Sequence, residues 1–144
     1  MKLLSLTEFS IYLDQRPGEL AGLLGVLRSD GIEAQAIAIS EHNGRGLVRV
    51  LGEPVDAFRR VAEALADRGV GPVVEATVLA VDIDKRPSVM HDLAMALADH
   101  QINVRYGYTA PARNGRPGLF VFRVDDLDTV ISTIEGIDWP QNGD

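Results

Sequence analysis

Two short segments of the chain combine residue types that suit recognition of a small carboxylate. They read DQRPG at 14–18 and DKRPS at 84–88, at matching points of the two halves of the chain. Each follows an alternating apolar stretch and precedes a leucine stripe, which predicts a turn from a strand into a helix. The first turn of a helix offers unpaired backbone N–H groups and a partial positive charge, both of which favour a carboxylate.

The last letter of each segment predicts a difference between the two loops. Gly18 has no Cβ, so it permits close approach of a ligand and leaves the helix N–H groups open. Ser88 is a preferred N-cap residue, and we expect its hydroxyl to satisfy the helix end by itself. The first loop is therefore the expected ligand cradle. The alternative is that Arg-Pro only fixes a turn in both loops, because Pro suits a helix start and restricts the residue before it.

Other polar residues near these loops also leave two interpretations open. Asp14 and Asp84 either bias the entrance of the helix electrostatically or are simply solvated. Tyr106 and Tyr108 either pack on a sheet face or stack on a ligand, and packing is the commoner role of such residues.

The composition excludes several classes of function. The formal net charge of −7 and a sequence pI near 4.9 argue against a nucleic-acid partner, which requires clustered Lys and Arg. The chain has no cysteine, so disulfides and thiolate catalysis are excluded and a reducing cytoplasm is the expected location. No apolar stretch approaches the length needed to span a bilayer, and no signal peptide is recognisable.

Metal, cofactor and catalytic motifs are not expected either. The three histidines, His42, His91 and His100, do not have metal-ligand spacing. The NGRG segment at 43–46 is predicted to be a hairpin turn rather than a phosphate loop. Asp126 is expected to cap the last helix.

Sliding the second half over the first reveals an internal repeat. Asp14, Arg16, Pro17, Leu23, Leu27 and Ile32 recur as Asp84, Arg86, Pro87, Leu93, Leu97 and Ile102. A repeat of this length indicates two copies of one fold unit, which we place at 1–74 and 75–144.

Each copy is predicted to follow the order βαββαβ. In the first copy the expected elements are strand 9–13, helix 20–27, strand 32–40, strand 47–52, helix 54–65 and a long strand at 72–84 that continues into the second copy. In the second they are helix 90–97, strand 102–109, strand 119–124 and helix 127–134. The tail at 137–144 is too short for a full final strand.

This order predicts an α+β fold with two ferredoxin-like repeats, each an antiparallel four-stranded sheet with both helices on one face. Apolar residues fall on both faces of the strand at 32–40, with Ala36 on one side and Ile37 and Ile39 on the other. The face away from the helices is therefore expected to be covered by the other copy or by a second chain, which favours a homodimer.

The order of these motifs resembles the ACT domain over roughly residues 5–139. The resemblance is carried by RPGEL at 16–20 with Gly31-Ile32, by Arg86-Pro87, and by INVRYGYTA at 102–110 followed by FRVDD at 122–126. It implies two ferredoxin-like units, no catalysis and no cofactor, and binding of a small effector, most often an amino acid, between two ACT units. The ligand-binding residues that it implies are Gln15, Arg16, Pro17, Gly18, Glu19, Leu20, Ile32, Glu33, Lys85, Arg86, Pro87, Ser88, Val89, Met90, Ile102 and Asn103.

The leading hypothesis is a regulatory module with its ligand site between the first loop and Asn103 of a second repeat. Any regulation would pass through a protein partner or through oligomerisation. The alternative is a ligand-free interaction module, and a small enzyme on the same scaffold stays open because fold does not fix function.

Overall fold

The computed structural model describes residues 1–139. The chain forms two compact units, each with its own hydrophobic core. One unit is the continuous segment 7–76, and the other combines residues 1–6 with the chain from residue 77 onward. The first six residues therefore belong to the same unit as the second half of the chain.

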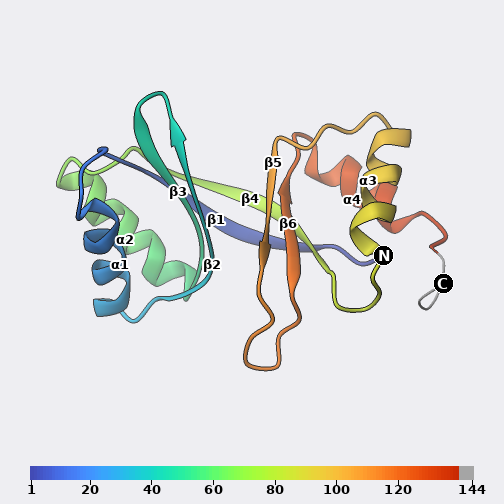
Figure 1. The fold of residues 1–144 in the computed structure, drawn as a ribbon, viewed down its shortest axis with the longest axis horizontal. Coiled ribbons are helices and arrows are strands. Elements are labelled where there is room, and N and C mark those ends of the chain that lie inside the picture. Colours follow the sequence, from blue (N-terminus) through green and yellow to red (C-terminus); the bar gives the residue numbers. More distant parts are fainter. Residues whose placement is uncertain (140–144) are drawn as a thin grey trace. The chain divides into compact units, whose positions relative to one another are not determined.

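The unit at 7–76 contains most of β1 (Leu4–Leu13), then α1 (Glu19–Ser29), β2 (Glu33–His42), β3 (Arg45–Glu53), α2 (Val55–Asp67) and the start of β4 (Val73–Asp82). Its strands follow the order β2-β3-β1-β4, and β3 pairs antiparallel with both β1 and β2 (Figure 1). The start of β4 lies beside the end of β1, since Tyr12 N–H donates to Pro72 O at 3.1 Å.

The core of this unit lies between the sheet and its two helices. Phe9 of β1 stacks on Phe58 of α2 with ring centroids 4.1 Å apart. A Cβ at Gly52 would lie 2.7 Å from the Phe58 ring, so this strand position requires glycine to admit the ring. The other buried members are Ile11, Leu13, Leu23, Leu27, Ile32, Val48, Val50, Val61, Ala62 and Leu65.

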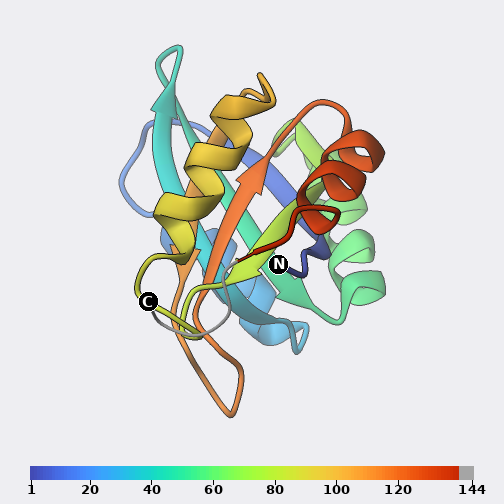
Figure 2. The ribbon, with the colours of Figure 1, turned by 90° about the vertical axis from the view of Figure 1, so that its right-hand side faces the viewer.

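The second unit contains the rest of β4, α3 (Val89–Asp99), β5 (Tyr106–Ala110), β6 (Leu119–Arg123) and α4 (Leu127–Glu135). β6 pairs antiparallel with β4 and β5. Leu4–Leu6 of β1 belong to this unit, and β1 neighbours β4 in the sheet. Both helices lie on the same side of these strands, with the N-terminus close to β4 and α4 (Figure 2).

Residues 1–6 are tied into the second unit by packing and by a hydrogen bond. Leu3 is buried in a core that includes Leu79, Leu93, Phe122 and Ile134. Its backbone N–H donates to Glu135 Oε1 at 3.2 Å, across 132 positions of sequence. The N-terminal residues therefore occupy the sheet position beside β4 that a final strand after α4 would take in this fold.

The predicted α+β fold with two ferredoxin-like βαββαβ units is confirmed. The Asn-Gly turn at 43–44 has the two positive φ angles, 51° and 79°, that a two-residue hairpin favours, and Asn114-Gly115 repeats them. Asp126 caps α4 as predicted, since its Oδ1 accepts from Thr129 N–H at 3.3 Å. The division at 74/75 stays a prediction, and part of the predicted tail, residues 140–144, lies outside the described residues.

One predicted strand begins late. The strand expected at 102–109 is regular only from Tyr106, although Arg105 N–H already donates to Arg123 O at 2.9 Å. Residues 102–104 instead follow the end of α3, where Ile102 N–H bonds back to Leu97 O at 2.8 Å. Ile32 makes the equivalent bond to Leu27 O at 2.9 Å, and β2 nevertheless begins at Glu33, so the late start is specific to the second unit.

Candidate ligand-binding loops

The first loop is an exposed turn held by ion pairs. The guanidinium of Arg16 lies 3.1 Å from Asp14 Oδ2 and 3.0 Å from Glu19 Oε1, and its side chain is 67% exposed. Asp14 Oδ1 also lies 3.5 Å from a guanidinium nitrogen of Arg45 at the start of β3. Asp14 therefore links the loop to the neighbouring strand, a role that the sequence reasoning did not consider.

The start of α1 is open. Gly18, the N-cap residue, has φ = 92°, in the left-handed region that glycine adopts at little cost, and no side chain caps the helix. No heavy atom lies within 4 Å of the position that a Cβ on Gly18 would take. The backbone here therefore requires glycine for its conformation, and the first-turn N–H groups lack a side-chain partner.

A pocket of about 330 Å³ adjoins this loop. Five of the predicted ligand residues line it, together with Ile39, Gly46 and Val48 from β2 and β3; the five are Gln15, Arg16, Pro17, Glu19 and Leu20. Gly18 lines a second pocket of about 370 Å³ between α1 and the end of α2, where the lining includes Leu65 of α2 and Arg68 and Val70 after it.

The other two predicted residues of this unit lie far from the loop. Leu13, next to the loop, pairs with Gly46 at one end of β3, whereas Glu33 pairs with Glu53 at the other end. At about 3.4 Å per residue, the two ends are more than about 20 Å apart. Ile32 is buried in the core and Glu33 is exposed. Within this unit, the loop and the start of β2 therefore do not meet.

The second loop holds its arginine differently. The side chain of Arg86 is only 9% exposed, and its guanidinium lies 2.8 Å from Asp92 Oδ2, one turn into α3. Ser88 Oγ donates to the same carboxylate oxygen at 3.2 Å. Asp92 therefore joins the loop to the helix.

The prediction that Ser88 caps its own helix is wrong. Ser88 is the N-cap residue of α3, but its side chain makes no capping hydrogen bond. Its hydroxyl donates to Asp92 Oδ2, which lies one turn along α3 and therefore next to Ser88. The contrast expected between an open and a self-capped loop therefore does not exist in this form.

Asp84 links the second loop to the start of β6, which Gly118 immediately precedes. Its Oδ2 accepts from Gly118 N–H at 2.5 Å, while its own N–H donates to Asp82 Oδ1 at 2.8 Å. Asp14 and Asp84 thus make the same kind of link, from the loop to the start of the third strand of the unit. Neither is merely solvated.

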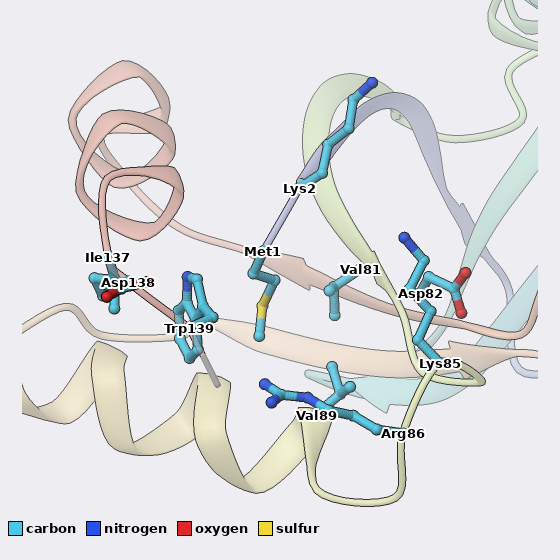
Figure 3. A pocket seen from close by; sticks show the side chains of 10 residues that line it. All are labelled: Met1, Lys2, Val81, Asp82, Lys85, Arg86, Val89, Ile137, Asp138 and Trp139. Atoms are coloured by element: carbon cyan, nitrogen blue, oxygen red, sulfur yellow. The ribbon is translucent and has the colours of Figure 1, made fainter. Parts of the chain in front are cut away.

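A larger pocket, of about 480 Å³, adjoins the second loop. Figure 3 shows its lining: Val81, Asp82, Lys85, Arg86 and Val89 from β4, the loop and α3, with Met1, Lys2, Ile137, Asp138 and Trp139. The indole N–H of Trp139 donates to Ile134 O at 2.8 Å, which orients the ring.

Of the predicted ligand residues, Lys85, Arg86 and Val89 line this pocket. Met90, the residue after Val89, is exposed. Ile102 and Asn103 lie at the far end of the sheet, near the pairing of Tyr106 with Arg123, whereas Asp82 pairs with Leu119. Sequence reasoning missed Trp139 because the tail was judged only as a possible strand. Trp139 is the single tryptophan of the chain and comes just after the last helix, and this could have been used as a signal.

Comparison with models of protein families identifies the family of this chain. The sequence model for the family described as "ACT domain pair" matches residues 4–136. The chain belongs to the ACT domain pair family. The predicted resemblance is thereby confirmed over almost the whole length.

Several solved structures have a similar fold. A protein of Bacteroides thetaiotaomicron matches with a TM-score of 0.75 and 21% identity, over 93% of this chain and 89% of that one. The ligand-free regulatory subunit of aspartate kinase from Thermus thermophilus matches with a TM-score of 0.65 and 14% identity, over 94% and 97%. Aspartate kinase of Clostridium acetobutylicum matches with a TM-score of 0.53 and 11% identity, over 93% of this chain and 33% of that one. At sequence identities this low, the matches show a similar fold only.

Three further findings concern this ACT domain pair. A search of curated protein sequences finds no match. Within residues 1–139, no three His, Asp or Glu side chains gather as metal ligands would. No helix in the same part of the chain is both long enough and apolar enough to cross a membrane.

Proposed function

We propose that this ACT domain pair is a non-catalytic regulatory module that binds a small effector, an amino acid, at its first loop. The observation that carries the proposal is the open start of α1. Its N-cap is a left-handed glycine, no side chain caps its first turn, and a pocket adjoins it. Backbone N–H groups at a helix start, with the positive end of the helix dipole, bind a carboxylate.

The remaining contacts of the amino acid are proposed to come from a second ACT unit. Within the unit at 7–76, the start of β2 lies at the opposite end of the sheet from the loop. Asn103, the counterpart of Glu33, is exposed and carries both a donor and an acceptor, so it is suited to either end of an amino acid. The complete site therefore takes the loop from one unit and residues 102–103 from another, in this chain or in a partner.

The proposal includes a homodimer and a regulated protein partner in the cytoplasm. β2 is at the edge of its sheet, and its Ile37 and Ile39 side chains are 38% and 58% exposed. Burial of such side chains by a second chain favours association. Binding of the effector would then alter how the dimer contacts the protein that it regulates.

Thermal-shift and calorimetric titration with the common amino acids test the proposed effector. A bound amino acid raises the melting temperature by mass action, because it binds only the folded state. We expect Asn103→Ala to weaken binding by about tenfold or more, the effect of losing a hydrogen bond to a charged group. Gly18→Ala is expected to weaken it as well, because alanine disfavours the left-handed turn.

Ser88→Ala, at the equivalent position of the second loop, is the matched control and is expected to leave this affinity unchanged. Equal affinity in wild type, Gly18→Ala and Asn103→Ala would refute the proposed site.

A ligand-free interaction module is the second candidate, and the exposed isoleucines of the edge strand favour it. It predicts no thermal shift with any amino acid. It also predicts a dimer whose dissociation constant rises when Ile39 is replaced by Lys, measured by analytical ultracentrifugation.

A further inference from the structure

α1 and α2 pack beside each other (Figure 1), and a pocket of about 370 Å³ lies between α1 and the end of α2. We call it the α1–α2 pocket. Its lining is mainly apolar, since Leu23 and Leu65 are core residues and Val26 and Val70 are half-buried. Gly22 adds no side chain, and no heavy atom lies within 4 Å of the position that its Cβ would take. Apolar surface is therefore left open on the helical side of this unit.

The second unit has the same kind of space between α3 and the residues after α4. The internal repeat places Asp92 and Ala96 at the positions of Gly22 and Val26. Both line a pocket of about 290 Å³ together with residues 137–139. The two pockets are therefore equivalent, since each lies between the first helix of a unit and the chain that leaves its second helix.

The two units differ in what their own chain places there. Trp139 is half-buried, packs against the core of the second unit and lies beside α3 (Figure 3). Its indole N–H donates to Ile134 O in the last turn of α4, which orients the ring. Trp139 is three residues after the C-cap of α4, and the residue three positions after the C-cap of α2 is Gly71. The first unit thus has a glycine in place of the indole, and no aromatic residue of the described chain lines the α1–α2 pocket.

The charged residues of the α1–α2 pocket leave one cation available. Arg68 is exposed, and its side chain forms no ion pair with any residue in the range 1–139. Glu19, which also lines the pocket, lies 3.0 Å from the guanidinium of Arg16. A guanidinium favours a carboxylate as its partner. An aromatic residue with an acidic neighbour, as in the pair Asp138 and Trp139, therefore suits both the apolar lining and Arg68.

We propose that the α1–α2 pocket docks an aromatic side chain, tryptophan above all, from a short acidic segment of another protein. The ring lies against Gly22 and Val26, and a carboxylate next to it in the segment pairs with Arg68. A polypeptide is favoured over a free small molecule, because a side chain of the chain itself lines the equivalent pocket and aromatic anchors dominate protein interfaces. The inference rests on the protein partner included in the proposed function, and it does not depend on the effector.

Amide NMR titration of the isotope-labelled full chain tests the proposal with a neutral probe. N-acetyl-L-tryptophanamide carries the indole but neither a carboxylate nor an ammonium group, so it does not compete for an amino-acid site. We expect saturable shifts at Gly22, Val26 and Val70.

Peptides test the acidic neighbour. Acetyl-Ile-Asp-Trp-amide, which repeats residues 137–139, is expected to bind several-fold more tightly than acetyl-Ile-Asn-Trp-amide, because only the first carries a carboxylate for Arg68. Acetyl-Ile-Asp-Ala-amide, which lacks the ring, is expected to give no saturable shift.

Gly22→Leu fills the pocket without strain, because Gly22 is inside a helix and has open space at its Cβ. We expect it to weaken N-acetyl-L-tryptophanamide by about tenfold or more, since the ring loses its apolar contact. Gly25→Leu is the matched control, because Gly25 has the same open space on α1 but does not line the pocket. It should leave the affinity unchanged. Arg68→Gln is expected to remove the preference for the Asp peptide over the Asn peptide and to leave the neutral probe unaffected.

The absence of a saturable shift with both the neutral probe and the Asp-Trp peptide overturns the proposal, and so does an affinity that Gly22→Leu leaves unchanged. A dimer that dissociates in Gly22→Leu but not in Gly25→Leu, measured by analytical ultracentrifugation, assigns the pocket to a second copy and also overturns it. Binding of the neutral probe by a protein that binds no amino acid leaves the docking pocket standing and refutes the effector. Binding of an amino acid without any response to the probes does the reverse.

Discussion

The two loops between first strand and first helix share four nearly identical letters but use their arginines in opposite ways. Arg16 is 67% exposed and reaches Asp14 and Glu19 on the surface. Arg86 is 9% exposed and is held by Asp92 against the pocket of its unit. The repeated motif therefore fixes the turn but not the environment of its charged side chain.

The difference arises from two residues outside the motif. Glu19 is replaced by Val89 at the equivalent position, and Gly22 is replaced by Asp92. In the first unit the carboxylate on the helix is in the first turn, and its side chain is 31% exposed. In the second it lies one turn later, so Arg86 must fold back along α3 to reach it. The buried arginine is thus the one whose carboxylate partner lies three positions further along the helix.

Replacing each arginine by Met has the largest expected effect on this comparison. Arg86→Met leaves Asp92 partly buried without its cationic partner and is expected to lower the free energy of unfolding by about 2–3 kcal/mol. Arg16→Met removes only exposed pairs and is expected to cost less than about 1 kcal/mol. Urea unfolding of both variants measures the difference. Equal losses of unfolding free energy would show that the burial of Arg86 does not contribute to stability.

The residue after the Pro gives the next largest effect. Gly18→Ala is expected to destabilise by about 1 kcal/mol, because alanine disfavours φ = 92° even though its Cβ meets no atom. Ser88→Ala is expected to cost about 0.5 kcal/mol, since Ser88 has φ = −91° and makes no capping hydrogen bond. Thermal unfolding distinguishes them. A larger loss for Ser88→Ala than for Gly18→Ala would reverse the contrast between the loops.

The smallest expected effect concerns how the fourth strand of the unit at 7–76 is anchored. The start of β4 is tied to α2 by Arg59, whose Nη2 lies 2.6 Å from Glu75 Oε1. The hydrogen bond from Arg59 holds the pKa of the Glu75 carboxyl below its ordinary value, and it also raises the pKa of Arg59.

Glu75→Gln is therefore expected to reduce stability slightly at neutral pH. Because the folded-state pKa of Glu75 is lowered, the contribution of its charge is present above the ordinary glutamate pKa and is lost as the pH falls through the folded-state value. Urea unfolding of wild type and Glu75→Gln should thus differ near pH 7 and converge in acid. A gap that widens in acid would contradict this assignment.

Much of the fold was predictable because local signals agreed with one another. The Asn-Gly pairs require positive φ, and the leucine stripes identify the buried faces of the helices. The duplication then indicated that both halves form the same unit. What could not be predicted was that residues 4–6, and not the segment after α4, lie beside β4 in the second unit. Residues 4–6 carry the same apolar alternation whichever unit they join, and only packing around Leu3 selects the second.

The candidate site was less predictable. The open start of α1 followed from Gly18, but the role of Ser88 did not, because it depends on how Asp92 is placed one turn into α3. The pocket at Trp139 depends on three segments that are distant in sequence, so no local pattern indicates it.

The placement of residues 1–6 also has a consequence for the order of folding. The unit at 7–76 is continuous, so all of its contacts form between residues of one uninterrupted stretch. The other unit must join Leu3 to Glu135, 132 positions away, and closing so long a loop costs entropy before the contact is gained. The continuous unit is therefore expected to assemble first, and the other to be completed only when both ends of the chain have come together.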